Sequence, residues 1–159
     1  MTIVALSFLA IALLVFIIGL TMPARREYLR QGEFKAAPDR VFRIVSDVAA
    51  QANWRSDVKE IIVADSITWT EIPYSGTPLT FRIKQKVENH IFEIEIIKPA
   101  SINGSWIGVF EESGSGTKIE FKEVIVVKNP FLRVFSAVFL DLDKTMDVYM
   151  LNLKNTLGE

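Results

Sequence analysis

The sequence contains no cysteine and a single histidine, His90, so several kinds of functional site are excluded from the start. Without thiols there is no disulfide, no cysteine nucleophile and no zinc–thiolate centre. One histidine also excludes a metal site built from several imidazoles. An excess of charge of one sign is lacking too, because 18 basic and 19 acidic residues give a net charge of −1. That balance offers no basic field for nucleic acid, and we expect no nucleic-acid partner.

Recognisable catalytic and cofactor motifs are also missing. The chain has no phosphate-binding loop, dinucleotide fingerprint, serine elbow or zinc motif. Asp141, Asp143 and Asp147 resemble a cation site, but Asp143 and Asp147 lie one helical turn apart and can flank Lys144 on a solvated face. His90 falls in a predicted turn without a group to orient it as a base. We therefore predict no metal, no cofactor and no catalytic residue.

A long apolar run is what the sequence does have. Residues 3–22 carry no charge, and a helix of that length spans roughly 30 Å, the thickness of a bilayer core. A cleaved signal peptide remains an alternative, although nothing before Ile3 is positive and Met22-Pro23-Ala24 is a poor cleavage site. A buried core helix would usually be shorter and amphipathic. We predict a single transmembrane anchor at 3–22, a juxtamembrane spacer at 23–31 and one domain at 32–159.

The charges beside this segment predict its orientation. Arg25, Arg26 and Arg30 all follow the apolar run, and positive charge is retained on the cytoplasmic side of single-pass proteins. The expected product is a single-pass membrane protein with a cytoplasmic domain.

The domain reads as strand, two short helices, six strands and a long helix. A strand is expected at residues 33–37, and a helix follows Pro38 with apolar residues at Val41, Ile44, Val45 and Val48. Period-two alternation then marks strands near 79–88 and 92–96, and β-rich runs mark 58–64, 67–72, 105–111 and 118–127. Short turns between them favour antiparallel pairing.

A final helix is predicted from Asn129-Pro130 to the end of the chain. Apolar residues recur at helical spacing through it, and asparagine followed by proline is a typical helix start. A sheet with one apolar face must be covered, and this is the only element long enough to do so. The fold class is therefore α+β: a curved antiparallel sheet of about seven strands wrapped around a long C-terminal helix.

Residues 34–54 resemble the opening of the START-like, or helix-grip, superfamily, which includes Bet v 1-like and polyketide cyclase-like proteins. The matching residues are Pro38, Asp39, Val41, Phe42, Asp47 and Trp54. Residues 116–119 are similar to the turn into the last strand of that family, and Asn129-Pro130-Phe131-Leu132 with Leu151, Leu153 and Lys154 are similar to its final helix. The resemblance covers residues 32–158. It implies a cavity between sheet and helix that holds an apolar molecule. A minority of the members of this superfamily are enzymes.

The predicted ligand-binding residues are the inward positions of the strands and of the last helix. They are Phe81, Ile83, Gln85, Phe92, Ile94, Phe110, Phe121, Phe135, Phe139, Leu142, Met146 and Tyr149. A filled core without a cavity is the alternative, since protein interiors normally close-pack.

Two polar residues fall among these inward positions. Gln85 could bind a polar group of a ligand, or make an internal hydrogen bond, as buried polar groups normally do. Glu123 shares the inward parity of Phe121, but its charge favours a bulge that would turn it outward.

Three functions fit these observations. The first is a membrane-anchored module that binds or transfers a lipid-like molecule; the second is a cyclase- or aromatase-type enzyme, which would need polar groups gathered inside the cavity. The third is binding of a protein partner. The nearly all-hydrocarbon lining favours the first, and Gln85, Glu123 and Tyr149 clustered around one cavity would favour the second.

Overall fold

A computed structural model describes the backbone of residues 2–139 and 141–159 and the side chains of 3–137 and 141–159. Its strands form one antiparallel sheet in the order β1-β7-β6-β5-β4-β3-β2. The strands are β1 (Arg25–Phe34), β2 (Val58–Val63), β3 (Thr68–Pro73), β4 (Leu79–Val87), β5 (Ile91–Lys98), β6 (Ile102–Ser113) and β7 (Gly116–Val127). The helices are α1 (Thr2–Thr21), α2 (Pro38–Ser46), the 3-10 helix η1 (Val48–Asn53), α3 (Pro130–Phe139) and α4 (Leu142–Leu157). The predicted α+β helix-grip class is confirmed.

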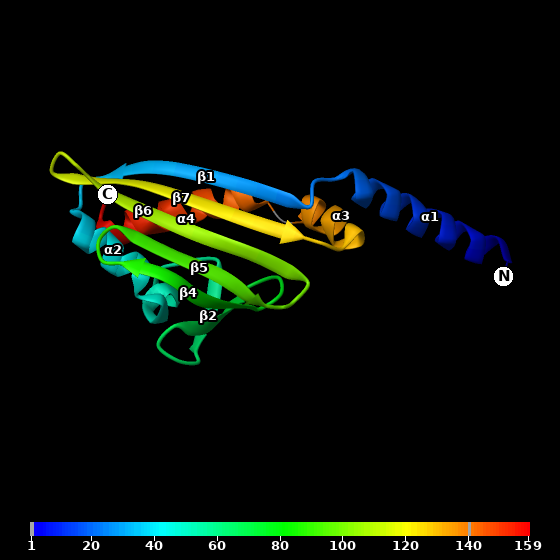
Figure 1. The fold of residues 1–159 in the computed structure, drawn as a ribbon, viewed down its shortest axis with the longest axis horizontal. Coiled ribbons are helices and arrows are strands. Elements are labelled where there is room, and N and C mark those ends of the chain that lie inside the picture. Colours follow the sequence, from blue (N-terminus) through cyan, green and yellow to red (C-terminus); the bar gives the residue numbers. More distant parts are fainter. Residues whose placement is uncertain (1, 140) are drawn as a thin grey trace.

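The core lies between the inner face of the sheet and the helices α2 and α4 (Figure 1). On α2 the predicted apolar stripe is fully buried at Val41, Phe42 and Val45. The ring of Phe42 meets Phe92 and Phe110 edge-on, with centroids 6.5 and 5.3 Å apart. Aromatic pairs prefer this geometry, so α2 is held over strands β5 and β6 by directional contacts as well as by burial.

The first strand is longer than predicted. β1 begins at Arg25, so most of the predicted spacer and the predicted strand at 33–37 are replaced by one strand that pairs with β7 along its whole length. Backbone bonding to β7 starts even earlier, where the Val127 amide donates to the Ala24 carbonyl. The sequence did not indicate this strand, because charged residues occur at both odd and even positions of 25–30 and no alternation is visible. The strand forms because pairing with β7 satisfies its backbone hydrogen bonds whatever the side chains are.

The predicted long C-terminal helix is two helices, α3 and α4. Asp141 leaves the helical conformation and its carboxylate accepts a hydrogen bond from the Lys144 amide, which caps α4. Further along, Asp143 and Asp147 both bind Arg30 of β1, at 2.8 and 2.6 Å. Both aspartates are more than half exposed, so they lie on the predicted solvated face and pair there with the sheet edge.

The helix α1 extends away from the sheet, and α3 packs beside its C-terminal end (Figure 1). Residues Ile3–Thr21 have a mean hydropathy of 3.1, with 6% of the apolar window buried in the protein, so this helix is long and apolar enough to cross a membrane. Phe131 of α3 contacts Phe16 of α1, with ring centroids 5.5 Å apart. Arg133 of α3 donates to the carbonyl of Gly19, at 3.2 Å. The contacts tie the end of α1 to the domain.

Candidate functional site

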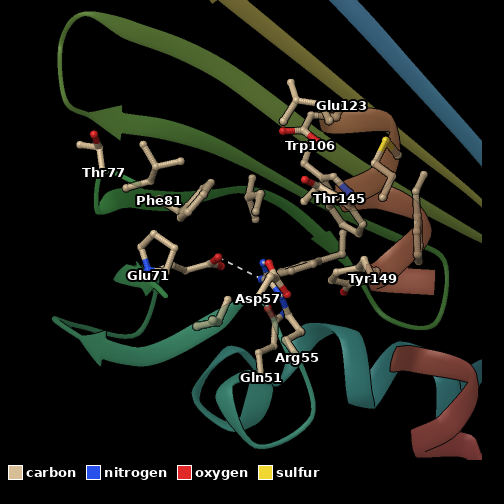
Figure 2. A pocket seen from close by; sticks show the side chains of 18 residues that line it. Gln51, Arg55, Asp57, Glu71, Thr77, Phe81, Trp106, Glu123, Thr145 and Tyr149 are labelled. Atoms are coloured by element: carbon tan, nitrogen blue, oxygen red, sulfur yellow. Dashed lines mark hydrogen bonds and ion pairs between the residues drawn. The ribbon is translucent and has the colours of Figure 1, made fainter. Parts of the chain in front are cut away.

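A cavity of about 210 Å³ separates the N-terminal half of α4 from the sheet. Strands β2 to β7 and the turn after η1 close it on the other sides (Figure 2). The C-terminal half of α4 is different, because Leu153 and Leu157 there are packed into the core. The helix therefore fills one half of the concave face and leaves the other half open. This is the arrangement that the predicted cavity requires.

Seven of the twelve predicted ligand-binding residues line this cavity. They are Phe81, Phe92, Ile94, Phe121, Leu142, Met146 and Tyr149. They come from β4, β5, β7 and α4. The periodicity of each of these elements had predicted that these side chains point into one common space. Whether they contact a ligand is a proposal taken up below.

Gln85 was predicted inward and instead is exposed on the outer face of the sheet. A bulge between Ile83 and Gln85 is the cause, because Ile83 pairs with Ile94 whereas Gln85 pairs with Glu93. One extra residue in a strand reverses the parity of everything after it. As a result Lys86, opposite Phe92, takes the inward side and lies over the Phe42 ring, 5.7 Å from its centroid.

Three of the four remaining predicted residues do not line the cavity either. Phe110 is a core residue packed between Phe42 and Phe121, and Ile83 packs against the core beside the cavity. Phe135 lies on α3 and is 57% exposed. The side chain of Phe139 lies outside the described part of the chain.

Aromatic rings close the inner end of the cavity. Tyr149 of α4 is surrounded by Trp54, Trp106 and Phe121, with centroids 5.2, 6.1 and 5.5 Å away. The Trp106 ring folds over Gly108, where an added Cβ would lie 2.7 Å from the indole. Glycine at this position therefore lets the indole lie against the strand. Burial raises the pKa of the Tyr149 hydroxyl, so that group stays protonated.

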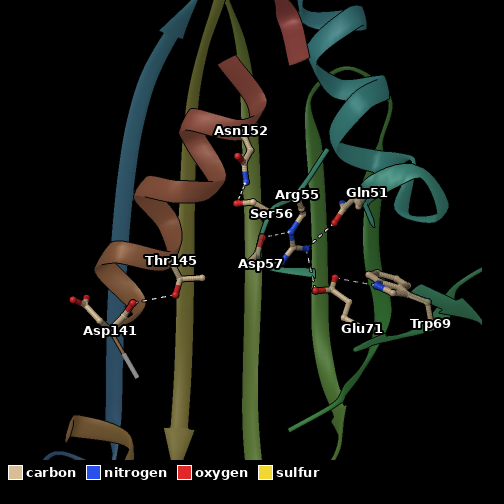
Figure 3. Close-up of polar contacts among 9 residues, drawn as sticks. All are labelled: Gln51, Arg55, Ser56, Asp57, Trp69, Glu71, Asp141, Thr145 and Asn152. Carbon is tan, nitrogen blue, oxygen red and sulfur yellow. Dashed lines mark hydrogen bonds and ion pairs between the residues drawn. The ribbon is translucent and has the colours of Figure 1, made fainter. Parts of the chain in front are cut away.

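Arg55 is the main feature that the sequence did not reveal. Its side chain is 12% exposed and donates to Asp57 (2.6 Å), Glu71 (3.0 Å) and Gln51 (2.8 Å), as Figure 3 shows. Burial alone would lower the pKa of the guanidinium, but the carboxylates of Glu71 and Asp57 raise it above its ordinary value. The result is a fixed, charged polar wall on one side of an otherwise apolar cavity.

The neighbours of this ion cluster hold it in place. Glu71 also accepts a hydrogen bond from the Trp69 indole at 3.2 Å, and Gln51 donates to the Val45 carbonyl at 2.8 Å. A sequence signal existed: Glu71 shares the inward parity of the buried Trp69 on β3, and a charged residue at such a position needs a buried partner.

Glu123 lines the cavity, contrary to the expected bulge. β7 pairs without irregularity on both edges, so Glu123 stays on the inner face, opposite Trp106 and Tyr28. It makes no hydrogen bond or ion pair with the described part of the chain. Burial raises the pKa of its carboxyl to about 7, while Arg55 opposes and Glu71 adds to the shift.

The buried carboxyl makes stability depend on pH. A raised pKa means that the folded state holds this proton more tightly than the unfolded chain does. The stabilisation is therefore present at acidic pH and is lost as pH rises through about 7. As the pH rises from roughly 5 to 8, we expect ionisation of Glu123 to lower the free energy of unfolding by about 2 kcal/mol. Chemical unfolding followed by tryptophan fluorescence measures this.

The control is Glu120→Gln, which changes a carboxylate on the outer face of the same strand that binds Gln31. We expect Glu123→Gln to flatten the pH dependence and Glu120→Gln to leave it unchanged. Equal slopes in the wild type and Glu123→Gln would contradict a raised pKa at this site.

Metal binding finds no support in the described residues, among which no group of three or more histidine, cysteine, aspartate or glutamate side chains could hold an ion. His90 is exposed at the turn between β4 and β5, and its Nδ1 lies 3.1 Å from the Phe110 carbonyl. It does not line the cavity.

Comparisons with known proteins relate this fold to solved structures. No protein-family model and no curated protein matches the sequence. A START superfamily protein from Mycobacterium smegmatis is similar in structure, with a TM-score of 0.68 at 12% identity over 83% of this chain and 97% of that one. Ara h 8.0201 has a TM-score of 0.61 at 12% identity, over 85% and 99% of the two chains.

A third similar structure is the di-domain ARO/CYC protein StfQ from the steffimycin biosynthetic pathway. Its TM-score is 0.65 at 8% identity, over 86% of this chain and 53% of that one. At such identities the likeness concerns the fold. The chain thus has the START-like helix-grip fold, preceded by an apolar helix long enough to span a membrane.

Proposed function

We propose that this protein is a membrane-anchored module that binds a lipid-like apolar molecule in the cavity between its sheet and α4. The observation that carries the proposal is the cavity itself, about 210 Å³ in volume and lined mainly by hydrocarbon and aromatic side chains. Protein interiors normally close-pack, so an apolar space left open at one end of a well-packed core indicates a binding site.

The position of the cavity supports a ligand taken from a bilayer. Its helical wall is the first half of α4, which directly follows α3, and α3 packs on the end of α1. We propose that α1 spans the membrane with the domain on the cytoplasmic side, as the arginines after it favour. Anchoring then keeps the cavity close to a high local concentration of lipid.

Helix α3 supports contact with the membrane surface. Leu132 and Phe135 stand three residues apart on one face and are 37% and 57% exposed. With Phe131 they extend the apolar surface of α1. A soluble surface rarely exposes such a continuous patch, and an amphipathic helix beside a membrane span suits the interface of a bilayer.

A labelling experiment tests this seating. The chain has no cysteine, so Leu132→Cys and Leu151→Cys each give one site for a fluorophore. Leu151 is 57% exposed on α4 and serves as the control. In nanodiscs that contain brominated lipid, we expect at least twofold stronger quenching at position 132, because quenching requires contact with lipid. Equal quenching at both positions would contradict an interfacial α3.

Uptake of a ligand is tested with a photoreactive long-chain alcohol. The full chain in nanodiscs is irradiated with the probe, and labelled residues are mapped by peptide mass spectrometry. Labelling of α4 residues that line the cavity supports the proposal, while labelling of α1 reports the probe in the bilayer. Labelling confined to α1 and α3 would count against it.

An enzyme of the cyclase or aromatase type is the second candidate. Glu123 and Tyr149, two of the three polar residues that would favour it, line one cavity, whereas Gln85 does not. A carboxyl with a pKa of about 7 is suited to general acid–base catalysis near neutral pH. Loss of turnover in Glu123→Gln, for a polyketide-like substrate that the wild type converts, would favour this function over binding alone.

A further inference from the structure

The charged side chains around the cavity are unequal in number. Among the residues that the structure describes, three carboxylates, those of Asp57, Glu71 and Glu123, line it with one guanidinium, that of Arg55. Figure 2 places Glu123 across the cavity from Arg55, so acidic groups face the space from two sides. An anionic ligand would therefore enter a region whose net charge is negative whether or not Glu123 is protonated.

The one cation is already engaged by protein groups. Of the five N–H donors of Arg55, two serve Asp57, at 3.2 and 2.6 Å, and two serve Glu71 and Gln51, at 3.0 and 2.8 Å. The face of the guanidinium lies over the Tyr149 ring, 5.3 Å from its centroid. One N–H is left over, so a ligand carboxylate or phosphate could bind through two N–H groups only by breaking a buried ion pair, which is costly.

Glu123 differs from Arg55, because its carboxyl lines the cavity without a hydrogen-bond or ion-pair partner in the described chain. Its side chain is partly exposed to the cavity, and a ligand that covers the carboxyl must supply a hydrogen bond, because a covered polar group without a partner is destabilising. A hydroxyl group both donates and accepts, so it satisfies this carboxyl in either protonation state. A second carboxylate satisfies it only if one of the two is protonated, and otherwise repels it.

We propose that the cavity selects apolar molecules with a neutral hydroxyl group, such as long-chain alcohols, over fatty acids and other anionic lipids. This inference rests on the proposed function and adds the chemical class of the ligand. The hydrocarbon part lies against Phe81, Ile94 and Phe121, and the hydroxyl hydrogen-bonds to Glu123.

A competition experiment tests the selectivity. The full chain in nanodiscs is labelled with the photoreactive alcohol, in the presence of an unlabelled alcohol or the carboxylate of equal chain length at pH 8. The amount of each competitor in the bilayer is measured, so that competition is compared at equal membrane concentration. We expect the alcohol to reduce labelling of the cavity at a concentration about tenfold lower than the carboxylate, since like charges in a partly buried site repel strongly.

Two variants assign the effect to particular charges. Glu123→Gln removes the unpartnered acid, so the carboxylate should compete several-fold better than it does in the wild type. The difference in competing concentration between alcohol and carboxylate should then become smaller. Glu120→Gln, on the outer face of the same strand, should leave the difference unchanged. Should Glu123→Gln unfold the chain, an alkyl sulfonate of equal chain length, which stays ionised at both pH values, replaces the carboxylate. Its disadvantage relative to the alcohol should then be smaller at pH 5, where Glu123 is protonated, than at pH 8.

The outcomes separate the two proposals. Equal competition by alcohol and carboxylate, or stronger competition by the carboxylate, overturns the selectivity while leaving an apolar site in place. A complete lack of cavity labelling, with α1 labelled normally, overturns the proposed function and this inference with it.

Discussion

Replacing Arg55 with methionine is expected to lower the free energy of unfolding by about 3–5 kcal/mol, the usual cost of breaking a buried ion pair from one side. The variant keeps an unbranched side chain but removes the guanidinium, which leaves Glu71 and Asp57 without a cation. Glu71 is 8% exposed and keeps only the hydrogen bond from Trp69. Chemical unfolding of the full chain in nanodiscs, followed by tryptophan fluorescence, measures the loss.

A matched control is available on the sheet surface. Arg82 pairs with Glu95 across β4 and β5 at 2.5 Å, but its side chain is 50% exposed. We expect Arg82→Met to cost about 1 kcal/mol or less, as exposed pairs do. Adding Glu71→Gln to Arg55→Met should restore part of the stability, because the uncompensated charge is then removed. Similar losses in Arg55→Met and Arg82→Met would mean that the Arg55 cluster is not a buried network.

Filling the cavity is expected to abolish ligand uptake. Leu142 is the first residue of α4 and lines the cavity, so Leu142→Trp places an indole in space that the ligand would use. We expect photolabelling of the cavity to fall at least about tenfold, since the contacts of an apolar ligand depend on the volume left for it. The thermal unfolding midpoint should change little, because the added ring enters a void rather than a packed core.

Leu151→Trp is the control for this substitution. Leu151 lies on the same helix, is 57% exposed and does not line the cavity, so labelling should stay at the wild-type level. If Leu142→Trp and Leu151→Trp were labelled equally at the residues that line the cavity, the probe would not occupy the space that Leu142→Trp fills.

The sequence predicted the parts of this protein that depend on local pattern. Alternation placed Phe81, Phe92 and Phe121 on the inner face, and the helical period placed Met146 and Tyr149 opposite them. Each of these positions is set by a period that runs through one element. The apolar run of α1 was equally plain, because length and absence of charge suffice to recognise it.

The features that were missed depend on contacts between distant segments. The bulge after Ile83 exists because β4 must pair with β5 in a particular register, and no local pattern encodes that choice. Arg55 follows a short 3-10 helix, and its partner Glu71 lies on another strand. Glu123 was doubted because a charge at an inward position is costly, yet its neighbours on both edges pair without a bulge.

The break before α4 shows the same limit. The apolar spacing continues from Phe135 to Leu153, and on period alone the two helices read as one. Asp141 interrupts it by capping α4, and α3 packs beside α1, with Phe131 against Phe16, while Phe135 stays exposed. This is why Phe135, which the period assigned to the cavity, lies outside it.

The most direct test of a ligand-binding cavity is the map of residues labelled by the photoreactive alcohol in the wild-type chain. If the cavity binds apolar molecules, labels are expected on Leu142, Thr145 and Met146 of α4 and on Phe121 of β7, in addition to α1. Labels on α1 and α3 alone, with these four residues unmodified at every probe concentration, would contradict a ligand-binding cavity.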